Sequence, residues 1–226
     1  MKILAVDTST KSCSVAITED NNLIIELLLA SGRTHSIHLM DMVKQALKLA
    51  MIAVDEIDGY AVAIGPGTFT GLRIGLSTIK GLAAATNKPV VAISTLKALA
   101  FQAFAHTGLI YPMIDARRGE IYFAGYRQIE EKLIETIAPQ AASVQNFLNS
   151  ALEPGLLIGN GVSLCNDLIN NKTGFFQTAS DHLHTLRASA VAHLSFKQFS
   201  ENKIFMPETL VPQYIRKSDA ELRARS

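Results

Sequence analysis

Residues 3–10 read Ile-Leu-Ala-Val-Asp-Thr-Ser-Thr, a short apolar run that ends at Asp7 and a polar turn. The same order returns at residues 109–119, where an apolar run ends at Asp115 and the turn Ala-Arg-Arg-Gly follows. Each turn leads into another apolar segment, so the pattern predicts antiparallel strands at both places. The repeated order indicates an internal duplication, and we place the domain boundary near His106.

The composition is typical of a folded protein with little net charge. Of its 226 residues, 48% are hydrophobic and 18% are charged. The 21 Lys and Arg residues nearly balance the 20 Asp and Glu residues. Because the net charge is only +1, unaided binding to nucleic acid is not expected. The two cysteines are too few for a disulfide framework, and no apolar run is long enough for a membrane span. We expect a cytoplasmic protein.

Residues 36–53 have a helical period with an unusually wide apolar face. At 100° per residue this face covers an arc of roughly 180°, whereas a helix that packs on one sheet needs a little over 100°. Two interpretations are equally open: the helix contacts a second body, or it is buried more deeply in its own domain. The apolar residues are Leu39, Met40, Met42, Val43, Ala46, Leu47, Leu49 and Ala50.

Residues 65–75, Gly-Pro-Gly-Thr-Phe-Thr-Gly-Leu-Arg-Ile-Gly, join a predicted strand to a predicted helix and are called the glycine segment. Such a turn can bind phosphate through free N–H groups. However, a dinucleotide fingerprint needs glycine where Thr70 stands, and a Walker A loop needs lysine directly after Gly71. Gly71 and Gly75 lie four residues apart on one helical face, which favours close contact with another helix over phosphate binding.

The polar candidates are ambiguous. His35 and His38 share a face, but no third ligand has a matching position, so a metal site is not indicated. Asp7 and Asp115 each end a strand, where a carboxylate could steer a metal or phosphate in a two-domain ATPase. An aspartate at such a place can equally cap its own turn, and the pattern favours that role.

Several segments together closely resemble the TsaB (YeaZ) family over essentially the whole chain: residues 65–75, 113–122 and 212–216, supported by 3–9 and 33–36. The resemblance implies the actin-like ATPase (ASKHA) fold, an α/β architecture of two related domains, each with a mixed β-sheet flanked by helices. We expect the domains at residues 1–106 and 107–206, with residues 207–226 packing back on the first.

The resemblance also implies a function: a non-catalytic subunit required for adding threonylcarbamoyl to N6 of adenosine at tRNA position 37. Such a subunit binds and activates its paralogue TsaD, and the P-loop ATPase TsaE joins them. In TsaD a His-x-x-x-His motif binds a metal, and the matching positions here are Thr95 and Leu99. A hydroxyl and an aliphatic group cannot replace two imidazoles, so we expect neither an intrinsic metal nor catalysis. The alternative is a stand-alone actin-fold ATPase or small-molecule kinase, for which the turn Gly-Asn-Gly at 159–161 could receive adenosine.

By the same resemblance the first two helices pack against TsaD, and a homodimer is expected when the chain is alone. The expected interface residues are Leu39, Met42, Ala46, Leu49, Gly71 and Gly75. ATP or ADP is possible in the complex, and the residues expected near it are Asp7, Thr8, Ser9, Asp115, Arg117 and Arg118. We expect tRNA to be bound only through the complex, although the tail is locally basic at Arg216, Lys217, Arg223 and Arg225.

Overall fold

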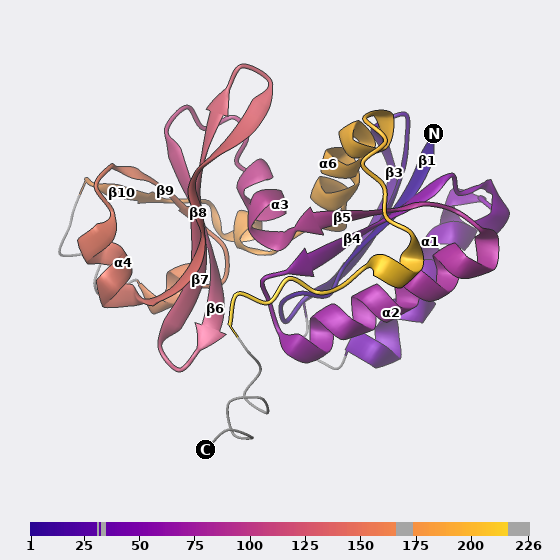
Figure 1. Ribbon diagram of the computed structural model, residues 1–226, viewed down its shortest axis with the longest axis horizontal. Coiled ribbons are helices and arrows are strands. Elements are labelled where there is room, and N and C mark those ends of the chain that lie inside the picture. Colours follow the sequence, from indigo (N-terminus) through magenta and orange to yellow (C-terminus); the bar gives the residue numbers. More distant parts are fainter. Residues whose placement is uncertain (31, 33–34, 166–173, 217–226) are drawn as a thin grey trace.

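The computed structural model describes the chain except for residues 31, 33–34, 166–173 and 217–226. It contains two β-sheets side by side, each flanked by helices (Figure 1). The side chains of residues 35 and 36 also lie outside the described part. Among the described residues, no helix is long and apolar enough to cross a membrane.

The first sheet has the strand order β3-β2-β1-β4-β5. Its strands are β1 (Lys2–Asp7), β2 (Cys13–Glu19), β3 (Asn22–Leu29), β4 (Gly59–Gly65) and β5 (Val90–Ser94). β1, β2 and β3 form an antiparallel meander, whereas β4 is parallel to β1 and β5 is parallel to β4. The predicted meander at the start of the chain is confirmed.

The second sheet repeats this topology in the order β8-β7-β6-β9-β10. Its strands are β6 (Leu109–Arg117), β7 (Glu120–Ile129), β8 (Lys132–Ser143), β9 (Gly155–Ile158) and β10 (Phe176–Thr178). β6, β7 and β8 are antiparallel neighbours, and β9 and β10 run parallel to β6. Because each strand has a counterpart at the same position in the first sheet, the internal duplication is confirmed.

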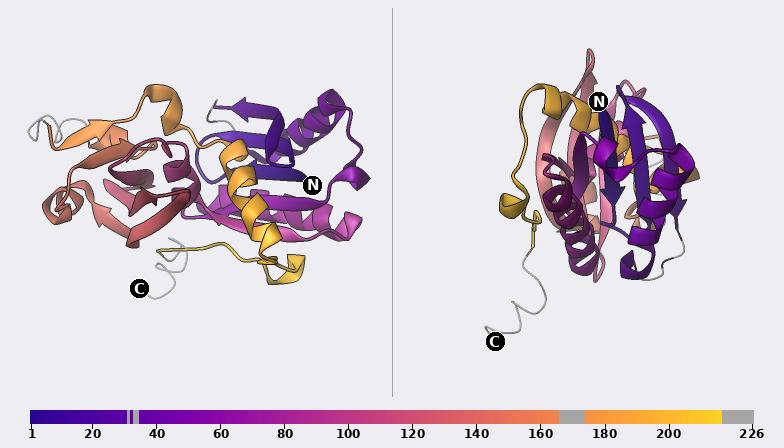
Figure 2. Two further views of the ribbon diagram at one scale, coloured as in Figure 1. Left: turned by 90° about the horizontal axis from the view of Figure 1, so that it is seen from above. Right: turned by 90° about the vertical axis from the view of Figure 1, so that its right-hand side faces the viewer.

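Helices cover both faces of the first sheet. α1 (His35–Ala50) and α2 (Phe69–Thr86) bury one face, and α6 (Ala188–Ser200) buries the opposite face (Figure 2). α3 (Thr95–Phe101) lies between the two sheets, and α4 (Val144–Ser150) packs on the second sheet. Single turns of 3-10 helix are η1 (Val54–Glu56), η2 (Val162–Leu164), η4 (Asp181–His184) and η5 (Pro207–Thr209).

The predicted extent of the second domain, 107–206, does not match the packing of α6. Ala188, Val191 and Ala192 of this helix are buried in the same core cluster as Ala5 and Ala16 of the first sheet. A helical period shows that a helix has an apolar face, but it does not show which sheet that face covers. Residues 207–210 also lie on the first domain: η5 contacts α2, and Leu210 is buried in the core shared by α1 and α2. Residues 217–226 of the predicted segment lie outside the described part of the chain.

Candidate functional site

The glycine segment lies directly on the turn that follows β1. A Cβ atom at Gly71 would lie 2.0 Å from the carbonyl oxygen of Thr8, and one at Gly75 would lie 2.4 Å from Thr8 Oγ1. At Gly67, the added Cβ would lie 2.3 Å from the carbonyl oxygen of Ser9. Glycine at these three positions therefore lets the start of α2, and the residues just before it, lie closer to the turn after β1 than any side chain would allow.

Hydrogen bonds hold this contact together. Thr8 Oγ1 donates to the carbonyl oxygen of Gly71 at 2.7 Å, and the backbone N–H of Thr68 donates to the carbonyl oxygen of Ser9 at 2.7 Å. Thr68 also caps α2, because its side chain accepts from the N–H of Gly71. The prediction that Gly71 and Gly75 face a partner helix is therefore wrong: their spacing does indicate a close contact, but with the chain's own turn.

Asp7 and Asp115 occupy equivalent turns and make the same local contact. Asp7 Oδ1 accepts from the N–H of Ser9 at 3.0 Å, and Asp115 Oδ1 accepts from the N–H of Arg117 at 2.7 Å. This is the turn-capping role that the sequence favoured. Asp115 is only partly buried, and its own N–H donates to Asn160 Oδ1 at 3.1 Å.

Asp7 differs from Asp115 in its burial. Its side chain is 0% exposed, and its Oδ2 finds no hydrogen-bond partner in the described part of the chain. Burial raises the pKa of Asp7 to about 6, although the hydrogen bonds with Ser9 favour the charged carboxylate. The nearby negative charge of Asp7 adds to burial in raising the pKa of the Cys13 thiol.

Arg117 and Arg118 form the exposed tip of the β6–β7 turn, with φ values of 65° and 57°. Arg216 contacts the Glu120 carboxylate at the start of β7, next to this turn. The remaining basic residues of the predicted tail, Lys217, Arg223 and Arg225, lie outside the described residues.

The positions that would carry the His-x-x-x-His motif are used for packing. Thr95 is fully buried, and its Oγ1 accepts from the N–H of Gly65 at 3.1 Å. Leu99 belongs to the core between the sheets, where it closely approaches Gly159. Throughout the described ranges, no three His, Cys, Asp or Glu side chains are grouped so that they could hold a metal ion.

The wide apolar arc of α1 is divided between the core and the surface. Leu39 and Ala46 are buried in the first domain, so their predicted exposure to a partner is wrong. Met42 is half-buried, and Leu49 is 61% exposed. Ile37 and Met40, which we did not predict as interface residues, are 67% and 39% exposed.

Beside α1, the exposed positions of α2 from Ser77 onward carry small side chains: Ser77, Gly81, Ala84 and Ala85; its first turns also expose Thr70 and Arg73. A Cβ atom at Gly81 would meet nothing within 4 Å. Gly81, which lies six residues beyond Gly75 in the helix, is therefore the α2 glycine that another molecule can approach.

Comparisons with known proteins agree with this architecture. A family model described as "TsaD: tRNA N6-adenosine threonylcarbamoyltransferase" matches residues 29–223. The tRNA threonylcarbamoyladenosine biosynthesis protein TsaB of Bacillus subtilis (strain 168) is 33% identical over 230 residues, covering 99% of this chain and 97% of that protein. TsaB of Escherichia coli (strain K12) is 29% identical over 226 residues, covering 97% and 96%.

Among solved structures, YeaZ from Pseudomonas aeruginosa superposes with a TM-score of 0.81 at 25% identity, covering 94% of this chain and 99% of that one. Component A of the (R)-2-hydroxyglutaryl-CoA dehydratase of Acidaminococcus fermentans, at 9% identity and a TM-score of 0.54, shares the fold alone. With the duplicated five-stranded sheets, these matches show the actin-like ATPase fold. The chain belongs to the TsaB (YeaZ) family.

Proposed function

We propose that this chain acts in tRNA threonylcarbamoyladenosine biosynthesis as a non-catalytic subunit that binds the paralogue TsaD. Family membership supports the pathway, because relatives that match nearly the full length are named for it. The proposal has three parts. The chain binds TsaD, TsaE joins the two proteins, and tRNA is contacted only through the complex.

The observation that carries the proposal is the exposed surface of α1 and α2, which we call the helix face. On α1 it presents Ile37 and Met40, whereas Leu49, nine residues after Met40, projects to the opposite side of the helix. The adjacent small residues of α2 would let a partner helix approach closely, since interhelical distance depends on the side chains at the contact. An apolar face next to such a flat one is typical of a surface that another protein covers.

Two features support a role without catalysis. The positions equivalent to the TsaD metal ligands, Thr95 and Leu99, are committed to the chain's own packing. In addition, α2 is packed directly against Thr8 and Ser9, in the turn that would face a phosphate in a two-domain ATPase. A stand-alone ATPase or kinase is the alternative, and tight binding of ATP by the isolated chain would favour it.

The test is the affinity for TsaD from the same genome, measured by titration calorimetry. Replacing Ile37 and Met40 together with glutamate would place two charges in an apolar contact, so we expect the affinity to fall by about tenfold or more. Leu152→Glu is the matched control, because Leu152 is 89% exposed in the second domain. If the double variant is folded and binds like the wild type, the helix face is not the TsaD surface.

A further inference from the structure

The chain passes between the two domains three times. It leaves the first domain after α3 (residues 102–108), returns before α6 (179–187), and approaches the second domain again along residues 210–216, which we call the C-terminal strap. We propose that side-chain contacts at the return crossing and at the strap lock the two domains in one mutual orientation, without a bound nucleotide.

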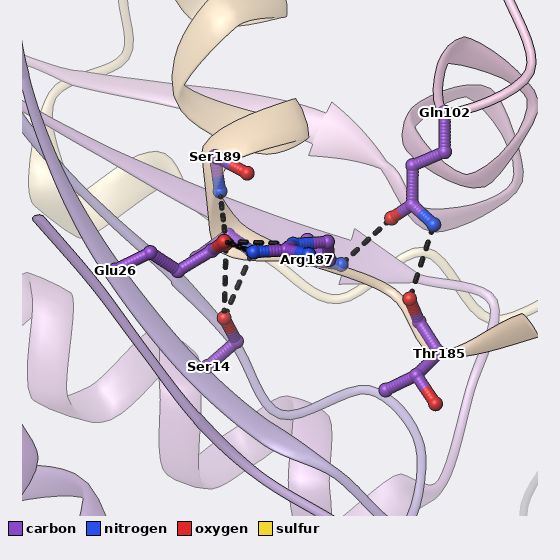
Figure 3. Close-up of polar contacts among 7 residues, drawn as sticks. Ser14, Glu26, Gln102, Thr185, Arg187 and Ser189 are labelled. Carbon is purple, nitrogen blue, oxygen red and sulfur yellow. Dashed lines mark hydrogen bonds and ion pairs between the residues drawn. The ribbon is translucent and has the colours of Figure 1, made fainter. Parts of the chain in front are cut away.

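The first contact, which we call the clasp, is centred on Glu26 in the middle of β3 (Figure 3). The Glu26 side chain is 3% exposed, and its Oε2 accepts from both Nε and Nη2 of Arg187, with the Nε distance at 2.7 Å. Both donors meet at this one oxygen, and such hydrogen bonds between charged groups are stronger than those between neutral groups. Removing one partner would leave a buried charge unpaired, so the contact resists opening.

The clasp also fixes the start of α6. The first N–H groups of a helix have no partner within the helix, and here side chains of the first sheet accept from them. The N–H of Ser189 donates to Glu26 Oε1 at 2.9 Å, and the N–H of Ala188 donates to Ser14 Oγ at 3.0 Å. The negative carboxylate at a helix N-terminus adds a favourable interaction with the helix dipole.

Gln102 joins the outgoing and the returning crossings (Figure 3). Its Nε2 donates to the carbonyl oxygens of Leu183 and Thr185, both at 3.0 Å, and its Oε1 accepts from the N–H of Arg187 at 2.8 Å. One side chain therefore fixes the two segments about which the domains would have to rotate.

The second contact is the C-terminal strap, which runs along α2 to the ends of β6 and β7 (Figure 1). On the first domain, the N–H of Gln213 donates to the carbonyl oxygen of Ile64 at 2.8 Å, and Tyr214 stacks on Phe69 with ring centroids 5.2 Å apart. On the second domain, Arg216 Nη1 binds the Glu120 carboxylate. The strap is therefore attached to both domains.

The Gln102 contact and the strap lie far apart along the chain but restrain the same motion. Hinge rotation between domains is absorbed by a few connecting residues. Rotation of the second domain would require the Gln102 hydrogen bonds to Leu183 and Thr185 or the Arg216–Glu120 contact to break, while the clasp holds the end of the return crossing on the first domain. Because the bridging groups belong to the chain itself, the fixed orientation does not require a ligand between the domains.

Distances between two spin labels, measured by pulsed electron paramagnetic resonance, test the lock. The labels are attached to cysteines introduced at Lys48 on α1 and Gln140 on β8, both exposed, while Cys13 and Cys165 are buried. An excess of unlabelled protein removes distances between copies. The variants are Gln102→Ala, Arg216→Ala and their combination, and Gln102→Glu removes the donor to Leu183 and Thr185 while keeping an acceptor for Arg187.

We expect one narrow distance distribution for the wild type, with or without Mg-ATP, and a distribution about twofold broader for the double variant. The matched control, Arg127→Ala, removes an exposed ion pair with Glu153 inside the second domain and leaves the width unchanged. A folded double variant, or a folded Gln102→Glu plus Arg216→Ala variant, with the wild-type width would overturn the lock. So would a wild-type distribution that Mg-ATP narrows or shifts. TsaD is absent from the experiment, so its result is independent of the proposed function.

Discussion

Gly71→Ala tests whether the glycine segment is a packing element of this chain. The new methyl group would lie 2.0 Å from the Thr8 carbonyl oxygen and 2.5 Å from Thr68 Oγ1. Backbone atoms cannot move away as a flexible side chain can, so overpacking costs about 3 kcal/mol, the upper end of its usual range. Displacing Thr8 also weakens its hydrogen bond to the carbonyl oxygen of Gly71, which contributes about 1 kcal/mol. The higher helix propensity of alanine offsets this second loss. The net loss in the free energy of unfolding is about 3 kcal/mol.

Urea unfolding measures this loss, and for a chain of this size it corresponds to a fall in Tm of about 6 to 12 °C. Gly81→Ala is the matched control, since it adds the same methyl group to the same helix with nothing within 4 Å. It should raise stability by about 0.5 to 1 kcal/mol. The reasoning is refuted if Gly71→Ala is as stable as the wild type, and above all if it is stable but no longer binds TsaD.

Three further predictions concern buried groups. Burial raises the pKa of Asp7 to about 6, above the ~3.9 of an unfolded chain, so the folded state binds this proton more tightly. Relative to Asp7→Asn, the wild type should therefore lose stability as the pH rises from about 4 to about 6, which urea unfolding of both proteins across that range would show. Because burial raises the pKa of Cys13 to about 12 and of Cys165 to about 11, neither thiol should react with a disulfide reagent at pH 8 until the protein unfolds. Leu39→Glu should cost several kcal/mol and prevent folding, whereas Leu49→Glu should change stability by less than about 0.5 kcal/mol, as thermal melts of the two variants would reveal.

The parts of the fold that the sequence predicts are those where local pattern and burial coincide. The apolar runs that end at Asp7 and Asp115 are almost wholly buried, and each forms the central strand of its sheet. β8 was not predicted because it is an edge strand in which only Leu133 is buried, so its sequence has little apolar alternation. β10 has only three residues, too few for any periodic signal.

The site was harder to predict because the same residue pattern is compatible with different neighbours. Two glycines four residues apart indicate a close approach, but only the structure shows that Thr8 is the group approached. The apolar arc of α1 likewise combines a core stripe with a surface stripe, and hydrophobicity does not separate Leu39 from Leu49. Glu26 could be singled out from the sequence, because it is the single charged residue within the apolar strand β3.

The central claim, that this chain is a partner subunit of TsaD, is tested most directly by size-exclusion chromatography with light scattering. The chain would be measured alone and mixed with TsaD from the same genome. We predict a new species at the summed mass of one copy of each protein, or of a symmetric multiple of that pair. If the two proteins elute separately at their own masses, with or without Mg-ATP and TsaE, the proposed function is contradicted.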